Sequence, residues 1–183
     1  VNMAVPSPVM HALAAEKSDE ALPHYLREDE IRRGVELLYF GYTRLTRSID
    51  EGLAKQGLGR AHHRALYFIA RQPDLTVSEL LRLLAITKQS LGRVLNDLTS
   101  RGLIEANSGK EDRRQKLLRL STGGVAFEAQ LFAALNNGLS TAYASAGQVA
   151  VDGFCSVLEG LIPAEDRSMV AALRLDGASR KDD

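Results

Sequence analysis

The segment from Thr87 to Leu98 mixes polar and apolar side chains with the repeat of a helix. At about 100° per residue, its apolar positions fall on one face and most of its polar positions on the opposite face. The apolar positions are Leu91, Val94, Leu95 and Leu98, and the opposite positions are Gln89, Gly92, Arg93 and Asn96. Arginine can bind guanine bidentately, and glutamine or asparagine can pair with adenine in the major groove of DNA. These side chains therefore suit the reading of base edges, although an ordinary solvated helix face would also be polar.

The first turn of this helix suits phosphate groups. Its residues Thr87, Lys88 and Ser90 offer two hydroxyls and an ammonium group. The first turn of a helix also leaves backbone N–H groups that can bind an anion. Gly92 adds no side-chain bulk, so the helix backbone could approach DNA closely. We expect these residues to fix the helix against the sugar-phosphate backbone.

A second group of candidate residues lies in a short basic segment after the helix. Its basic residues are Lys110, Arg113, Arg114, Lys116 and Arg119. Residues 76–120 hold nine basic and five acidic residues, whereas the whole chain has 23 of each and no net charge. Positive charge is therefore concentrated here, and an arginine at a loop tip can enter the narrow minor groove of DNA. The alternative is a solvated hairpin with scattered charges, and the neighbouring helices favour DNA.

Two short helices are predicted on either side of positions 85 and 86. Thr76 and Glu79 form a capping box, in which the threonine caps the helix and the glutamate reaches back to the cap. Thr87 can cap the second helix. Because only two residues separate the first helix from this cap, the helices must meet at a tight angle. The pattern predicts a helix-turn-helix.

The segment after the second helix predicts a β-hairpin. Gly102 can end the helix, and a strand begins at Leu103 and Ile104. Residues 108–112 are turn formers, and residues 115–120 return as a second strand. A hairpin directly after a helix-turn-helix is a wing. Ser121 can then cap a further, long helix.

The sequence from about residue 31 to about residue 162 resembles the MarR family of bacterial winged-helix regulators. The resemblance is carried by Thr76-Val-Ser-Glu-Leu-Leu, Ile86-Thr-Lys-Gln-Ser, Val94-Leu-Asn-Asp-Leu, Arg101-Gly-Leu-Ile-Glu and Asp112-Arg-Arg-Gln-Lys-Leu-Leu-Arg-Leu-Ser, followed by Gly124. It implies a homodimer whose N- and C-terminal helices pair, with the second helix of each pair in the major groove and each wing in the minor groove. It also implies that Asp112 binds one wing arginine, Arg113 or Arg114, and leaves the other for DNA.

Two long apolar segments support dimerisation independently of the resemblance. A helix from about residue 28 to about residue 55 carries an apolar stripe at Ile31, Val35, Leu38, Tyr42, Leu45 and Ile49. No lysine or arginine lies between Arg119 and Arg167, where a second apolar helical region is expected. A small winged helix offers too little surface to cover both segments, so we expect a homodimer.

The expected organisation has three parts. Residues 1–27 form a mobile N-terminal arm of open role, residues 28–58 and 121–175 form a helical dimerisation region, and residues 59–120 form a winged helix-turn-helix DNA-binding domain. The fold class is mainly α, with a small β-hairpin wing and long N- and C-terminal dimerisation helices.

Composition and missing motifs exclude other classes. The single cysteine, Cys155, excludes an internal disulfide framework, and its apolar surroundings predict a buried residue rather than a redox switch. His62 and His63 point to different faces of a helix and make a poor metal pair. The sequence has no phosphate-binding loop, dinucleotide motif or hydrolase motif, so we expect no metal, no cofactor and no enzyme activity. No apolar run approaches the about 18 residues of a membrane span. The first basic residue is Lys17, so the preceding residues lack the positive charge with which a secretory signal begins. We therefore expect a cytoplasmic protein.

A small aromatic or acidic ligand could bind between the long first helix and the winged helix. The candidate lining residues are Tyr39, Tyr42, Arg44, His63 and Tyr67. The alternative is that the tyrosines are core residues with satisfied hydroxyls.

The sequence therefore predicts a dimeric regulator that binds double-stranded DNA, represses at an inverted-repeat operator and is released by a ligand. The alternative is a winged-helix module for protein contact or RNA binding, without an operator.

Overall fold

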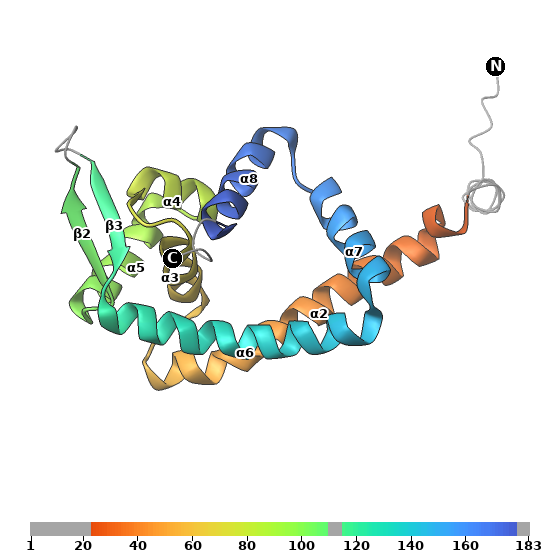
Figure 1. The fold of residues 1–183 in the computed structure, drawn as a ribbon, viewed down its shortest axis with the longest axis horizontal. Coiled ribbons are helices and arrows are strands. Elements are labelled where there is room, and N and C mark those ends of the chain that lie inside the picture. The colour runs from red at the N-terminus through yellow and green to blue at the C-terminus, as the bar shows by residue number, and fades with distance from the viewer. Residues whose placement is uncertain (1–22, 110–114, 179–183) are drawn as a thin grey trace, which may run out of the picture. The chain divides into compact units, whose positions relative to one another are not determined.

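The computed structural model describes residues 23–109 and 115–178 of the chain. These residues divide into two compact units, one up to Leu45 and one from Thr46 onwards. Because the boundary falls inside a helix, the two units are described separately below. Figure 1 traces the elements of both.

The first unit holds a short 3-10 turn, η1 (His24–Leu26), and most of the long helix α2 (Glu28–Lys55). Three acidic residues occupy the first turn of α2, where they favour the positive end of the helix dipole. Glu28 also accepts hydrogen bonds from Arg32, one turn later. Every side chain from Ile31 to Tyr42 is exposed in the single chain. The helix is therefore held by local interactions in this unit, and its apolar stripe is exposed from Ile31 to Tyr42.

The second unit begins with the last turns of α2, whose residues Ile49 and Leu53 are buried. A short turn, in which Gly57 adopts a positive φ of 63°, leads to α3 (Arg60–Arg71). The N–H of Gly59 caps this helix by donating to His62 Nδ1 at 3.1 Å. Helix α3 is the centre of the second unit, since it packs against α4, α5, α6 and β3.

The predicted helix-turn-helix is formed by α4 (Val77–Leu84) and α5 (Lys88–Ser100). The capping box is present, because Thr76 Oγ1 accepts from the N–H of Glu79 and Glu79 Oε2 accepts from the N–H of Thr76. Ala85 ends α4 in the left-handed conformation, with φ of 50°, and Thr87 caps α5. One left-handed residue and one cap thus produce the tight angle between the helices.

A three-stranded antiparallel sheet has the order β1-β3-β2, with β1 (Leu75–Thr76), β2 (Ile104–Ser108) and β3 (Lys116–Leu120). Strands β2 and β3 are the predicted hairpin, and they extend from the helices as a ribbon (Figure 1). The two-residue strand β1, which pairs Leu75 with Leu118, was not predicted. Thr76 is itself the cap of α4, so the local pattern predicts only the start of a helix, and the strand forms because these residues pair with β3, which is distant in sequence.

Three helices complete the second unit: α6 (Thr122–Ala146), α7 (Gln148–Gly160) and α8 (Ala164–Ala178). Helix α6 packs on α3, and α7 packs on α6 through the rings of Phe154 and Tyr143. Helix α8, for which the sequence shows no clear apolar stripe, lies beside α3 (Figure 1). There Arg71 Nη2 donates to the Leu173 carbonyl at 2.5 Å. No helix in the described ranges is both long enough and apolar enough to cross a membrane.

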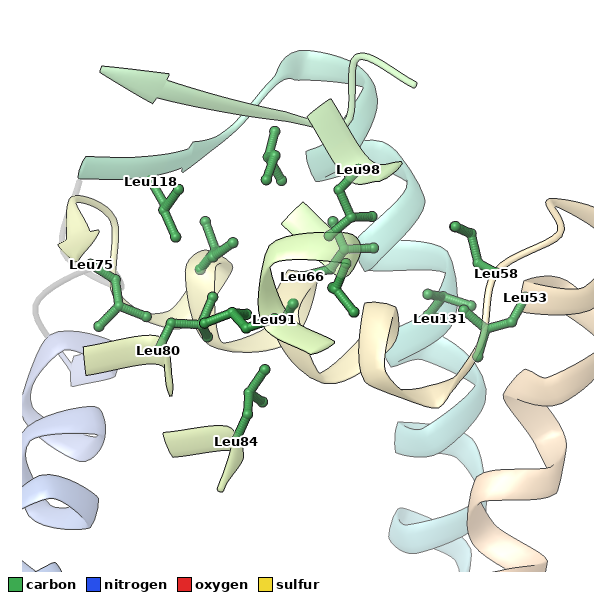
Figure 2. Packing of buried hydrophobic residues seen from close by; sticks show 14 of the residues in the cluster. Leu53, Leu58, Leu66, Leu75, Leu80, Leu84, Leu91, Leu98, Leu118 and Leu131 are labelled. Carbon is green, nitrogen blue, oxygen red and sulfur yellow. The ribbon is translucent and has the colours of Figure 1, made fainter. Parts of the chain in front are cut away.

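The core of the second unit is built almost entirely from aliphatic side chains, as Figure 2 shows. Leu66 and Ile69 of α3 meet buried residues from α4, α5 and the sheet. Leu131 of α6 lies beside Leu53 and Leu58 at the other end of the cluster (Figure 2). These contacts hold the outward face of α5 in a defined orientation.

Candidate nucleic-acid interface

Helix α5 turns its predicted polar face to solvent. Leu91, Val94 and Leu98 are buried against the core, and Leu95 is half-buried. The candidate DNA-binding residues of this helix and its cap are all exposed: Thr87, Lys88, Gln89, Ser90, Gly92, Arg93 and Asn96. The predicted exposure of these side chains is confirmed, and their contact with DNA stays a prediction.

The first turn of α5 is capped by its own side chains. It contains no acidic residue, and its cap is formed by the hydroxyl of Thr87, which accepts from the N–H of Ser90 at 3.2 Å. The same hydroxyl donates to Ser90 Oγ at 2.9 Å. Both hydroxyls take part in the cap. The full positive charge at this end of the helix therefore comes from the side chain of Lys88.

Two arginines near the candidate interface form ion pairs within the protein. Arg119 of β3 forms a bidentate ion pair with Asp74, which raises the pKa of the guanidinium chiefly through their hydrogen bond. Arg101 at the end of α5 donates to Asp97. Arg119 belongs to the basic segment of the sequence, yet its charge is neutralised at the base of the wing. The partner Asp74 is 45 residues away, and no local pattern indicates the pair.

The remaining cations of this face are unpaired within the described residues. There, no carboxylate lies within ion-pair distance of Lys88, Arg93 or Lys116. The predicted wing residues Lys110, Arg113 and Arg114, with the expected Asp112 ion pair, lie outside the described residues. The described part of the interface thus consists of α5 and the two strands of the wing.

The structure distributes the five candidate ligand residues over both units. Tyr39, Tyr42 and Arg44 are exposed on α2 before residue 46. In the second unit, Tyr67 lines a cavity of about 430 Å³ between α3, β3 and α6. Phe132, Arg71 and Glu128 line the same cavity. The predicted crevice between the helices stays a prediction, and the cavity is a feature that the sequence did not indicate.

Glu128 contributes a carboxyl group to the wall of this cavity. Burial raises the pKa of its carboxyl, and the nearby Arg71 opposes the shift. The walls therefore combine aromatic rings with charges of both signs, as a site for a small polar aromatic molecule would.

His63 belongs to the core of the second unit. Its side chain is 8% exposed, and its Nε2 atom has no hydrogen-bond partner among the described residues. Burial lowers the pKa of the imidazole below its usual 6.5, and the neighbouring Arg64 adds to the shift. The histidine is therefore neutral in the folded protein at neutral pH.

Acid should destabilise the protein partly through His63. Because the pKa of His63 is lower in the folded state, the unfolded chain binds a proton at a pH where the folded protein does not. The free energy of unfolding therefore falls as the pH drops below about 6.5. The unfolding free energy of His63→Leu should decline less than that of the wild type between about pH 7 and about pH 5. Denaturant titrations at both pH values measure this difference, and parallel declines would contradict it.

Comparisons with known proteins agree with this geometry. A family model described as MarR family matches residues 56–115. The HTH-type transcriptional regulator PetP of Rhodobacter capsulatus is 41% identical over 138 residues, which are 75% of this chain and 83% of the relative.

Solved structures of similar fold include the following three proteins. A cysteine-to-serine mutant of MarR from E. coli, complexed with operator DNA, has a TM-score of 0.59 and 22% identity, over 78% of this chain and 100% of that chain. A probable transcriptional regulator from Pseudomonas aeruginosa has a TM-score of 0.55 and 25% identity, over 69% and 94%. A MarR family protein of Mycobacterium tuberculosis, in complex with salicylic acid, has a TM-score of 0.51 and 23% identity, over 69% and 93%.

The helix-turn-helix, its exposed α5 face and the adjoining wing define a winged helix-turn-helix transcriptional regulator. The chain belongs to the MarR family.

Proposed function

We propose that two copies of this chain bind an inverted-repeat operator in double-stranded DNA and repress transcription there. The observation that carries the proposal is the exposed row Gln89, Arg93 and Asn96, held outward by the buried residues Leu91, Val94 and Leu98 on the opposite side of the helix. A polar row of this composition, projecting from the second helix of a helix-turn-helix, fits the major groove.

Each side chain has a definite role in this proposal. Gln89, Arg93 and Asn96 read base edges, and Lys88 binds phosphate with the first turn of α5. Lys110 binds the backbone, and either Arg113 or Arg114 enters the minor groove. Thr87 and Ser90 orient the first turn through their cap.

The exposed start of α2 supports the dimer. Val35 is 64% exposed and Leu38 is 47% exposed in the single chain, on the same side of the helix as Ile31 and Tyr42. Such a row is covered in most soluble proteins. In the proposed organisation, residues 28–58 and 121–175 pair the two copies, and residues 59–120 bind DNA. A two-fold dimer places the two α5 helices on half-sites about 10 base pairs apart.

Replacement of Arg93 should weaken and broaden DNA recognition. We expect Arg93→Ala to cost about 1–3 kcal/mol of binding free energy and to relax base preference at one position of each half-site. Selection from random duplex DNA, followed by anisotropy titrations of the enriched site, measures both quantities. The control is Arg167→Ala, which removes an exposed arginine of α8 outside residues 59–120, and the variant should bind as the wild type does provided that sedimentation shows it to be dimeric. Failure to enrich any palindrome would instead favour a module for protein or RNA contact.

A ligand that releases the DNA is the second part of the proposal. The cavity at Tyr67 and Phe132 touches β3, which continues into the wing, so a bound molecule could change the position of the wing. A structural relative binds salicylic acid. Salicylate should therefore dissociate the operator complex, and Arg71→Ala should raise the concentration required. An operator complex that is insensitive to salicylate would exclude this ligand.

A further inference from the structure

Asp97 is an acidic residue on the DNA-binding helix itself. It lies on the flank of α5, between the outward row and the buried face, four residues after Arg93. An unpaired carboxylate at this position would repel the phosphates of DNA. The structure instead turns it toward the protein, where His62 of α3 and Arg101 at the end of α5 bind it.

Each oxygen of Asp97 has its own partner. Oδ2 lies 3.1 Å from Nε2 of His62 on α3, and Oδ1 accepts from Nε of Arg101 at 3.0 Å. Because His62 Nδ1 accepts the N–H of Gly59, its proton sits on Nε2 and points at Asp97. The hydrogen bond from Arg101 is the main cause that holds the pKa of Asp97 below its usual value, so the carboxylate stays ionised.

Arg101 extends this group of contacts to a third element. Its Nη1 atom donates to the carbonyl of Gln56 at 2.5 Å, in the turn directly after α2. The three side chains His62, Asp97 and Arg101, which we name the α5 brace, therefore connect the flank of α5 with α3 and with the end of α2. None of them belongs to the outward row that faces DNA.

We propose that His62 and Asp97 are positioning residues for operator binding, because the α5 brace fixes the orientation of α5 against α3 and the end of α2. The inference rests on the proposed binding of operator DNA. Packing by Leu91, Val94 and Leu98 holds α5 on the core, while the brace fixes its rotation and its distance from the long helix. An altered rotation would move Arg93 away from the base edges.

Asp97→Asn tests the proposal, because the loss of a negative charge and the loss of positioning would change operator affinity in opposite directions. Removal of a negative charge beside DNA would by itself strengthen binding. If the brace positions α5, the variant binds the selected operator more weakly, by about three- to tenfold. Operator affinity equal to or above that of the wild type would overturn the inference.

Substitutions of His62 distinguish a loss of positioning by the brace from a loss of protein stability. His62→Leu removes both hydrogen bonds and should weaken binding about tenfold. His62→Gln keeps a donor and an acceptor and should restore affinity to within about twofold of the wild type. Equilibrium unfolding of each variant shows that the measured chains are folded, and Asp97→Asn serves alone if His62→Leu does not fold.

The salt dependence of binding distinguishes positioning from direct contact. The slope of log affinity against log salt should be unchanged in His62→Leu, because no phosphate contact is lost. A slope smaller by about one would show that His62 itself contacts phosphate, against the inference. Arg60→Ala removes an arginine of α3 that pairs with Asp50 of α2, outside the brace, and is the control with wild-type affinity. A wild-type chain that binds no operator would refute the proposed function rather than the brace.

Discussion

Gly124→Ala is expected to lower the free energy of unfolding by about 3 kcal/mol or more, the upper end of the usual cost of overpacking. Gly124 is buried in the first turn of α6. A Cβ atom there would lie 1.9 Å from the carbonyl oxygen of Leu103 and 2.9 Å from its carbonyl carbon. The obstacle is backbone, so no side chain can rotate away. The Leu103 oxygen also accepts the N–H of Ser121 at 3.1 Å, which prevents it from moving alone.

The neighbouring glycine provides the matched control. A Cβ atom at Gly123 would meet Ser121 Oγ at 3.8 Å, which is an ordinary contact. Alanine favours a helix over glycine by up to about 1 kcal/mol, so Gly123→Ala should be as stable as the wild type or slightly more stable. Denaturant midpoints of the two variants measure the difference. Equal midpoints would show that α6 is not packed this tightly against Leu103, in the turn between α5 and β2.

Structural features that depend on residues three or four positions apart were predictable from the sequence. Thr76, Thr87 and Ser121 each cap the helix that their position predicted, because the donor and the acceptor lie in the same turn. The apolar repeat of α5 determined its buried face for the same reason. The fold class, the helix-turn-helix and the hairpin all follow from these local patterns, and the structure confirms them.

Contacts between distant residues were not predictable. Asp74 meets Arg119 across 45 residues, and Arg71 meets Leu173 across 102 residues. From the sequence, His62 was considered only as a poor metal ligand together with His63, whereas in the structure it binds Asp97. Such pairs depend on how α3 packs among its neighbours. A count of basic residues therefore overestimates the charge available to DNA, since Arg101 and Arg119 are bound internally.

Leu38→Asp is expected to separate the proposed dimer and, with it, to weaken operator binding at least about 100-fold. Leu38 lies in the exposed apolar row of α2, and a carboxylate buried there without a partner costs several kcal/mol. Two-fold symmetry places the substitution in the interface twice, so the cost is incurred by both copies. A monomer then holds a single half-site and loses the gain from simultaneous contact of both.

The control places the same carboxylate on the other side of the helix. Arg33 is exposed about half a turn away from the apolar row, with only a local ion pair to Glu30 at 3.3 Å. Arg33→Asp should therefore remain dimeric, and its operator affinity should stay close to that of the wild type. Sedimentation equilibrium gives the oligomeric state of each variant, and anisotropy titration gives its affinity. If Leu38→Asp stays dimeric at micromolar concentration, the copies associate through another surface, and the apolar row of α2 must have a different partner.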